Sequence, residues 1–292
     1  NYERRFIMTF PNETLPKGRK QKTTALYDRF INQGAVMGDS FGLENVLWFA
    51  NNKNDAFENP TIKRSRSHDY VSKEVINVRE NVGLIEVANF SKHEFKGPDA
   101  RKFLDHIMAG RLPKPGRISL SPMLSYRGKL CGDLTVASFD ENEFIVFGSG
   151  AAQEMHRRWF ESHLGKFNLN YTNRSDEFHG LSIAGPNSRK VLEKIVRDDV
   201  SNEKFKFRDS RRMFVGGVPA IINRISFTGE LGYEIYVAPH YQIKLYEEII
   251  EAGKEFNIKP FGGRALMSMR LEKNWGAWTL DYRPDFTAKE TG

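Results

Sequence analysis

Two acidic residues lie in short motifs where a carboxylate could take part in binding or proton transfer. The first is Asp133 in YRGKLCGDLTV (126–136), where two glycines bracket a turn before an apolar strand. The second is Glu234 in FTGELGYEIYV (227–237), where a predicted hairpin turn precedes a strand of alternating residues. A carboxylate in such a place can accept hydrogen bonds or move a proton. Each motif therefore has a functional interpretation beside an ordinary structural one.

The structural interpretations come first when each motif is taken alone. Asp133 is favoured as a turn or capping residue at a strand entrance. Glu234 alternates with Tyr233 and Ile235, so its default place is the solvent face of the strand. If Glu234 faces a pocket instead, its two oxygens could accept two hydrogen bonds from the aminopyrimidine edge of a pterin or guanine.

Other chemistries find less support in the sequence. GSGAA (148–152) begins like a phosphate-binding loop but does not complete G-x-G-x-x-G, so a strand-end turn is favoured. The seven histidines are dispersed and none has metal-ligand spacing, so we expect no metal site. The single cysteine, Cys131, has no nearby histidine to activate it and is favoured as a small buried side chain.

The composition is that of a folded protein without membrane spans. The 292 residues are 39% apolar and 28% charged. No apolar run approaches the roughly 20 residues of a spanning helix, so we expect a soluble protein and no membrane partner. The net charge of +7 suits an anionic ligand. The basic residues are scattered, the densest cluster being Lys63, Arg64 and Arg66, and no nucleic-acid motif is visible, so we expect no nucleic-acid partner.

Hydrophobic periodicity predicts alternating helices and strands. Residues 1–22 indicate an extended arm, and 38–60 are rich in Gly and Asn around VLWFA. Helices are predicted within 23–35, 68–83, 93–109, 151–164, 180–196 and 241–256, with a helix end in 268–278. Strands are predicted at 83–90, 118–126, 129–139, 143–150, 167–175, 218–227 and 233–239, and at the starts of 93–109 and 180–196.

One supersecondary unit occurs twice. FKGPDARKFL (95–104) and IAGPNSRKVL (183–192) share the order strand, Gly-Pro, polar residues, helix. Each copy is followed by strands and another helix, which indicates a duplication rather than a short-period repeat. The sequence therefore predicts an α+β fold with two related antiparallel-sheet lobes and packed helices.

Four motifs together resemble a known family. In order they are GLIEVANFSKHEFKGPDA, YRGKLCGDLTV, FTGELGYEIYV and FGGRALMSMRLEKNWGAW. They resemble the folate-binding region of the dimethylglycine/sarcosine dehydrogenase family, which is similar to the aminomethyltransferase (T-protein) of the glycine cleavage system. KTTALYDRFINQGAVMGDSFGLENVLWFA resembles the segment that joins the flavin part of those dehydrogenases to their folate part. The resemblance implies a linker segment at 1–60 and a T-protein-like folate-binding domain at 61–292, in two lobes and without the family's C-terminal β-barrel.

The resemblance also implies a set of site residues. Asp133 matches the family's acid that faces the folate near N10, and Glu234 matches the acid that grips the pterin ring. The remaining matches line the folate cleft or contact the pterin: Leu120, Phe147, Ser149 and Phe227. One departure concerns an arginine that the T-protein carries before its R-L-E motif, where this chain has Leu266, with Arg264 two residues away.

The implied function is that of the tetrahydrofolate-binding part of an FAD-dependent N-methylamine dehydrogenase, acting on dimethylglycine or sarcosine. Tetrahydrofolate would capture the amine-derived one-carbon unit as 5,10-methylenetetrahydrofolate, with FAD held only in a partner or a further domain. Two alternatives stay open: a flavin-independent, folate-dependent aminomethyltransferase or demethylase, and a non-catalytic folate-binding module. The implied location is the cytoplasm, or the mitochondrial matrix in a eukaryote.

Overall fold

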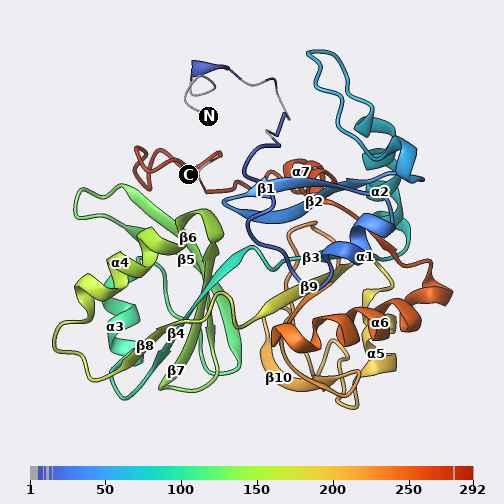
Figure 1. Ribbon diagram of the computed structural model, residues 1–292. Helices are drawn as coiled ribbons and strands as arrows, with labels where there is room; N and C mark the ends of the chain where they lie inside the picture. The colour runs from blue at the N-terminus through green and yellow to red at the C-terminus, as the bar shows by residue number, and fades with distance from the viewer. Residues whose placement is uncertain (1–5, 9, 11–12, 15, 279, 292) are drawn as a thin grey trace.

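Two lobes lie side by side, and a third layer of elements covers the top of one of them (Figure 1). This computed structural model describes residues 6–8, 10, 13–14, 16–278 and 280–291. The part of the predicted N-terminal arm that falls on residues 1–5, 9, 11–12 and 15 lies outside the described residues. The described ends of the chain, near residues 6 and 291, both lie at the top of the molecule (Figure 1).

The first lobe is a five-stranded antiparallel sheet in the order β5-β6-β7-β4-β8. Its elements are β4 (Phe90–Lys96), α3 (Ala100–Ile107), β5 (Arg117–Leu124), β6 (Leu130–Ser138), β7 (Glu143–Ser149), α4 (Gln153–Leu164) and β8 (Asn170–Asn173). Helices α3 and α4 cover one face, where Phe103 and Phe160 pack against Phe95, Leu134 and Val146. The other face of the sheet is therefore free to meet the second lobe.

The second lobe is a six-stranded sheet in the order β10-β11-β12-β9-β3-β13, antiparallel except for the short β13-β3 pair. Its elements are β3 (Gly83–Glu86), β9 (His179–Ala184), α5 (Ser188–Ile195), β10 (Ser210–Val215), β11 (Val218–Asn223), β12 (Gly232–Val237), α6 (Gln242–Gly253) and β13 (Lys259–Pro260). Helices α5 and α6 cover its outer face through Leu192, Leu245 and Ile249.

The third layer joins early and late parts of the chain. It consists of α1 (Tyr27–Asn32), β1 (Ala35–Ser40), β2 (Leu43–Phe49), α2 (Ser67–Glu80) and α7 (Gly263–Glu272). Helix α7 contacts both α2 and β2. Buried Glu74 of α2 accepts hydrogen bonds from the backbone N–H groups of Phe49 (2.7 Å) and Gly262 (3.0 Å), which ties the hairpin to the start of α7.

The predicted duplication is confirmed in three dimensions. The elements β4-α3-β5-β6-β7 of the first lobe correspond in chain order to β9-α5-β10-β11-β12 of the second. Their strands also take the same order across the sheets, β5-β6-β7-β4 in one and β10-β11-β12-β9 in the other. Gly97 and Gly185 each end the first strand with φ of +141° and +131°. A Cβ on either glycine would lie within 3 Å of backbone oxygens, so both steric space and conformation require glycine there.

The two sheets pack face to face through matching residues. The last residue of each first strand, Ala184 in β9 and Lys96 in β4, stands directly before the glycine of its Gly-Pro turn. When the lobes are superposed on these two residues, the strand registers make Tyr236 of β12 equivalent to Phe147 of β7. These two rings pack against each other with centroids 4.8 Å apart. They lie in an apolar cluster with Ile85, Ile145 and Ile221, which forms the core between the lobes.

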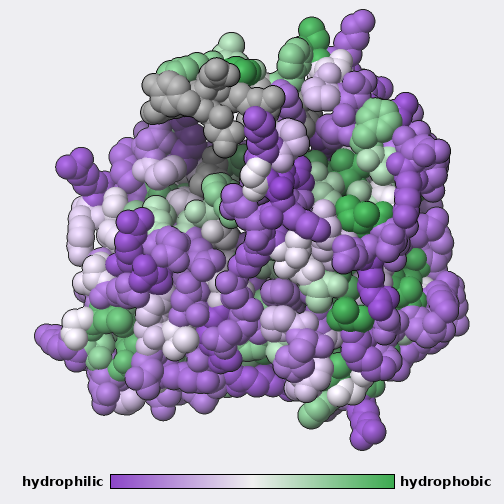
Figure 2. Space-filling view, viewed as in Figure 1, coloured by the Kyte–Doolittle hydropathy of each residue, from purple (hydrophilic) through white to green (hydrophobic). Residues whose placement is uncertain are grey.

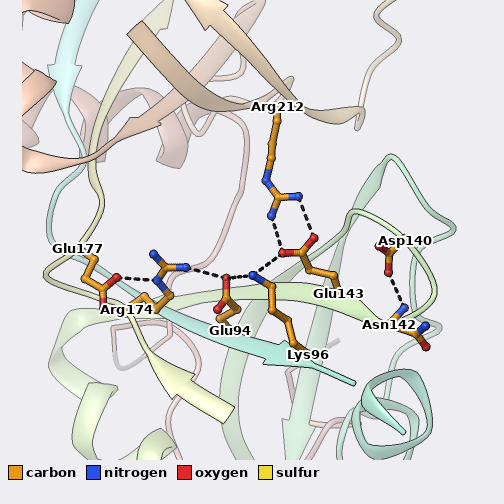
Figure 3. A network of polar contacts seen from close by, with 8 residues as sticks. All are labelled: Glu94, Lys96, Asp140, Asn142, Glu143, Arg174, Glu177 and Arg212. Carbon is orange, nitrogen blue, oxygen red and sulfur yellow. Dashed lines mark hydrogen bonds and ion pairs between the residues drawn. The ribbon is translucent and has the colours of Figure 1, made fainter. Parts of the chain in front are cut away.

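A chain of ion pairs runs along the edge of this interface (Figure 3). Arg212 of β10 donates two hydrogen bonds to Glu143 of β7, at 2.7 and 2.8 Å, and so links the second lobe to the first. Glu143 and Glu94 both bind Lys96, and Glu94 also binds Arg174. The apolar core between the lobes is thus bordered by a polar network.

The structure corrects three details of the predicted elements. Residues 83–90 are not one strand: β3 ends at Glu86 in one sheet and β4 begins at Phe90 in the other. The Gly- and Asn-rich segment 38–60 contains most of a β-hairpin, and strand β10 was not predicted. The predicted boundary between a linker at 1–60 and a domain at 61–292 stays a prediction.

Four residues of the predicted linker belong to the core of the second lobe: Leu26, Phe30, Ala35 and Val46.

Candidate functional site

A cleft of about 820 Å³ lies where the two lobes and the third layer meet. The first lobe contributes the middle of β5 and β6 and the end of β7, and the second lobe contributes β3, β12 and the turn before β12. The β1-β2 hairpin, α7 and the segment after α7 complete the walls. Most of this lining is apolar, as is typical of small-molecule sites.

The structure brings all six predicted site residues to this one cleft. They are Leu120, Asp133, Phe147, Ser149, Phe227 and Glu234. The strand register explains why four of them share a wall, because Leu120 pairs with Thr135, Pro122 with Asp133, and Thr135 with Phe147. Since side chains alternate between faces along a strand, these residues lie on the face turned toward the second lobe. The roles that the resemblance implies for them remain proposals.

Asp133 faces the cleft without a hydrogen-bond partner for its carboxylate among the residues that the structure describes. Its side chain is half-buried, and burial raises the pKa of its carboxyl above the usual range. The backbone just before it is held on the far side, where the ring of buried His156 bonds through Nε2 to the carbonyl oxygen of Cys131 at 3.1 Å. Asp133 is therefore a fixed carboxylate whose oxygens are available to a ligand.

Glu234 lies on the opposite wall and is more deeply buried, with 8% of its surface exposed. The hydroxyl of Tyr236 donates a 2.8 Å hydrogen bond to its Oε2, whereas Oε1 is bonded to no residue in the described ranges. Burial raises the pKa of the Glu234 carboxyl to about 7, while the Tyr236 hydrogen bond and the charge of Lys92 act to lower it. The expected solvent face of β12 does not exist, because all six residues of the strand are buried, and Glu234 lies in a pocket instead.

Aromatic and apolar side chains form the rest of the cleft near these acids. Phe227 stacks on Trp275 with ring centroids 6.2 Å apart. Phe147 is buried against Tyr236, whereas Leu120 is 64% exposed at the cleft mouth. Such surfaces suit a flat heterocycle and exclude water from it.

Several cleft residues were not found from the sequence. Glu86 at the end of β3 binds the side-chain amide of Gln242, and burial raises the pKa of its carboxyl to about 7. Trp278, the last residue of the motif FGGRALMSMRLEKNWGAW, was not among the predicted site residues, yet it lines the cleft and its ring centroid lies 5.5 Å from that of His156. Nothing in the residue types or spacing of that motif indicates that Trp278 would face the cleft.

Arg264 and Leu266 of α7 both line the cleft. The guanidinium of Arg264 donates to Ser67 Oγ at 2.6 Å and pairs with Glu58 at 2.7 Å. This cation is therefore neutralised by Glu58, which lies between β2 and α2. The turn Gly148–Ala151, which resembled the start of a phosphate loop, also lies along the cleft.

Neither a cluster of metal ligands nor a membrane-spanning helix is found in the described part of the chain. Within those residues, no group of three or more His, Cys, Asp or Glu side chains could hold a metal ion. None of the helices that the structure describes has the length and apolar character needed to cross a membrane. The face seen in Figure 2 is mainly hydrophilic, with small apolar areas scattered over it.

Comparison with known proteins gives relatives along nearly the whole chain. The model of the GCVT N-terminal domain family matches residues 26–292. Mitochondrial dimethylglycine dehydrogenase of Mus musculus is 35% identical over 98% of the chain, and human mitochondrial sarcosine dehydrogenase is 26% identical. Aminomethyltransferase of Thermoanaerobacter pseudethanolicus is 30% identical over 74% of the chain and is covered over 59% of its own length. The chain spans about a third of the length of the dimethylglycine dehydrogenases it matches.

The solved structure of glycine cleavage system aminomethyltransferase T from Bartonella henselae has the same fold, with a TM-score of 0.76 over 91% of this chain and 66% of that chain, at 22% identity. A chain of heterotetrameric sarcosine oxidase from Corynebacterium sp. U-96 gives a TM-score of 0.51 over 67% of this chain and 97% of its own, at 19% identity. The predicted T-protein-like α+β fold is confirmed by this likeness. The chain belongs to the GCVT N-terminal domain family and is homologous to dimethylglycine dehydrogenase, sarcosine dehydrogenase and aminomethyltransferase.

Proposed function

We propose that the cleft binds tetrahydrofolate and that the chain is the folate-binding part of a flavin-dependent N-methylamine dehydrogenase. The observation that carries this proposal is the pair of cleft carboxylates. Asp133 on one lobe and Glu234 on the other have oxygens without described partners and face one apolar cleft of about 820 Å³. A ligand that satisfies both acids must offer hydrogen-bond donors at separate points of a largely flat, apolar body, as a reduced pterin with its aryl amine does.

The described residues fit tetrahydrofolate. Glu234 is buried and has a free oxygen, so it can accept hydrogen bonds from the amino group and ring N–H of the pterin. Phe227, Phe147 and Leu120 supply apolar surface beside it, and Ser149 supplies a hydroxyl at the end of β7. When bound, tetrahydrofolate supplies the two amine nitrogens, N5 and N10, that take up a one-carbon unit as 5,10-methylenetetrahydrofolate.

Asp133 is the proposed catalytic residue. Its carboxylate can orient an amine, stabilise positive charge on the one-carbon unit and accept a proton from the attacking nitrogen. Burial raises the pKa of Asp133, which makes it a better base than an exposed aspartate. The apolar walls keep water from the reactive carbon and so limit its hydrolysis.

The comparisons support an oxidising unit outside this chain. The dimethylglycine dehydrogenases of mouse, human and rat are 34–35% identical to the chain, which matches about a third of their length. We place FAD and the oxidation of dimethylglycine or sarcosine in a further domain or partner, which would deliver the one-carbon unit to this cleft. The chain by itself is proposed to bind folate and to carry out the transfer step.

A second candidate is a flavin-independent aminomethyltransferase. The 30% identity to aminomethyltransferase over 74% of the chain favours it. Both candidates use the same folate cleft, and they differ in the donor of the one-carbon unit. Transfer from an aminomethyl donor without any flavin protein would favour this second candidate.

Anaerobic calorimetric titration with tetrahydrofolate tests the proposal. We expect saturable binding to the wild-type chain, weakened in Glu234→Gln and unchanged in Glu230→Gln, a control in the turn before the same strand. Equal binding by all three proteins would remove Glu234 from the site. No binding by the wild type would contradict the folate assignment. Saturable binding by the wild type that does not accelerate one-carbon transfer to tetrahydrofolate would indicate a non-catalytic folate-binding module.

A further inference from the structure

Lys92 is a charged residue in the interior of the molecule that the proposed chemistry leaves without a role. It lies in β4, is fully buried, and has no surface exposed to solvent. Its ammonium donates to two neutral carbonyl oxygens, those of Ala88 (3.0 Å) and Ser175 (3.4 Å). Within the described ranges it forms no ion pair with any carboxylate. A buried ammonium without an adjacent anion is costly, so its environment must compensate for it in another way.

The position of Lys92 connects it to Glu234 through Tyr236. In the β4-β7 register Lys92 pairs with Phe147, whose ring packs on that of Tyr236. The Lys92 Nζ lies 5.8 Å from the centroid of the Tyr236 ring. The hydroxyl of the same tyrosine donates to Glu234 Oε2 at 2.8 Å. The ring of Tyr236 thus connects the cation to the carboxylate in the buried core between the lobes, where low polarity strengthens the attraction between the two charges.

We propose that Lys92 is a positioning residue, the internal cation that keeps Glu234 ionised so that this carboxylate can accept hydrogen bonds from a pterin. The inference rests on the folate function proposed above. A protonated carboxyl would present an O–H donor to the donors of the pterin ring, whereas a carboxylate presents only acceptors. An ionised Glu234 in a buried site needs a compensating charge, and Lys92 is a buried cation whose charge acts on it.

The other charged groups around this pair are few. Glu234 faces Tyr236 on its own strand and Lys92 on β4. Lys92 also interacts with Glu86 of β3, with Asp176 after β8, with Lys22 before α1, and with His179 of β9. Burial lowers the pKa of Lys92 to about 7, although Asp176, Glu234 and Glu86 act to raise it. Burial raises the pKa of Glu234 to about 7.

These two titrations have opposite effects on folate binding. As the pH rises through about 7, Glu234 gains its charge, which strengthens binding. Over the same range Lys92 loses its charge, so it no longer stabilises the ionised form of Glu234, and binding weakens. Affinity for tetrahydrofolate is therefore expected to pass through a maximum near pH 7 in the wild-type chain.

Replacing Lys92 tests the inference, with Lys92→Met as a variant of similar shape and no charge. We expect tetrahydrofolate affinity at pH 7 to fall about tenfold for each unit by which the pKa of Glu234 rises. The acid limb of the affinity profile should move to higher pH and the alkaline limb should disappear. In Glu234→Gln the acid limb should disappear instead. The charge of Lys92 also lowers the pKa of Glu86, so Lys92→Met is measured in a Glu86→Gln background as well, which isolates the change that belongs to Glu234.

Each outcome of this calorimetric series has a definite meaning. A Lys92→Met profile parallel to that of the wild type, even with uniformly weaker binding, would overturn the role of Lys92 and leave the folate cleft intact. Absence of tetrahydrofolate binding by the wild type at every pH from 6 to 9 would overturn both proposals. An acid limb displaced to higher pH in Lys92→Met, followed by a plateau of affinity with no alkaline limb, would support the inference.

A measurement on the wild type alone covers the case in which Lys92→Met fails to fold. Titrations in buffers of different ionisation enthalpy report the protons exchanged on binding. We expect proton release on tetrahydrofolate binding below pH 7, where Glu234 must ionise, and proton uptake above pH 7, where Lys92 must become charged. Proton exchange of one sign throughout this range would overturn the inference.

Discussion

The two lobes are copies of one supersecondary design, yet they hold their carboxylates in opposite ways. Asp133, in the middle strand of the first lobe's β5-β6-β7 series, is half-buried and has no described hydrogen-bond partner. Glu234, in the last strand of the matching series of the second lobe, is buried and hydrogen-bonded to Tyr236. A carboxylate with free oxygens suits proton transfer, and a buried, oriented carboxylate suits recognition.

The comparison shows how a duplicated fold can divide one task. At the position of Tyr236 the first lobe has Phe147, which carries no hydroxyl to orient an acid. At the position of Lys92 the second lobe has Gly180. In the function proposed above, the second lobe supplies the acid and its tyrosine and the first lobe supplies the buried lysine, so recognition of a pterin would require that the lobes pack together.

The largest expected effect belongs to the first lobe's acid. Asp133→Asn keeps the shape of the side chain but removes its capacity to accept a proton, so we expect transfer to fall about 10²- to 10⁴-fold. Tetrahydrofolate affinity should change by less than about tenfold, because the proposed pterin contact, Glu234, belongs to the other lobe. The measurement is the split between 5,10-methylenetetrahydrofolate and free formaldehyde when a flavin-dependent dehydrogenase oxidises dimethylglycine in the presence of the chain.

Asp140→Asn is a suitable control, because Asp140 lies in the β6-β7 turn of the same lobe and does not line the cleft. Normal transfer by Asp133→Asn would remove this acid from the mechanism and with it the division of tasks between the lobes.

The second lobe's acid should show the reverse pattern. Glu234→Gln replaces an acceptor with a group that is part donor, and loss of a charged hydrogen bond costs about 1.5–3 kcal/mol. We therefore expect the dissociation constant of tetrahydrofolate to rise about tenfold to a hundredfold. Transfer at saturating tetrahydrofolate should stay near the wild-type rate. A Glu234→Gln protein that binds normally but transfers slowly would exchange the roles assigned to the two lobes.

The two Gly-Pro turns allow a direct comparison of stability between the lobes. Gly97→Ala and Gly185→Ala each put a methyl group against backbone oxygens at a positive φ, at 2.8 Å from Asn168 and 2.5 Å from Val78 respectively. We expect each change to lower the free energy of unfolding by roughly 1–3 kcal/mol. Chemical denaturation measures both losses, and Gly128→Ala, with no atom near its added methyl, controls for the positive φ alone.

If the Gly185→Ala loss is much the larger, the second lobe has less freedom to move than the first. That result fits the position of Gly185, because its backbone packs against Val78, Asn81 and Val82 around the end of α2. Losses no greater than that of Gly128→Ala would mean that neither turn is constrained by its neighbours.

Much of the fold could be predicted because its signals are local. The two Gly-Pro units and the amphipathic helices after them follow from neighbouring residues, and they identified the duplicated lobes. The passage from β3 to β4 could not be predicted in this way, since GLIEVANF alternates like a single strand. The chain leaves one sheet after Glu86 and enters the other at Phe90, a change that only the packing of the lobes determines.

The same distinction applies to the cleft. Asp133 and Glu234 lie in distinctive turn-and-strand motifs, so the resemblance could pick them out. Lys92, Glu86 and Trp278 gain their meaning from partners far away in the sequence, such as Ser175, Gln242 and His156. A buried lysine and an exposed one look alike in a sequence, because burial depends on the face of β4 that the other elements cover.

The smallest expected effect concerns the polar edge of the interface. Arg212→Gln removes the paired contacts with Glu143 that Figure 3 shows between the lobes. Arg212 is about half exposed, so solvent screens the pair, and we expect the free energy of unfolding to fall by less than about 1 kcal/mol. Arg157→Gln, which breaks ion pairs within α4 alone, is the matched control. If Arg212→Gln also weakened tetrahydrofolate binding while Arg157→Gln did not, the ion pairs would help to set the distance between the lobes. Unchanged binding in both variants would assign that role to the apolar contact of Phe147 with Tyr236, as its burial leads us to expect.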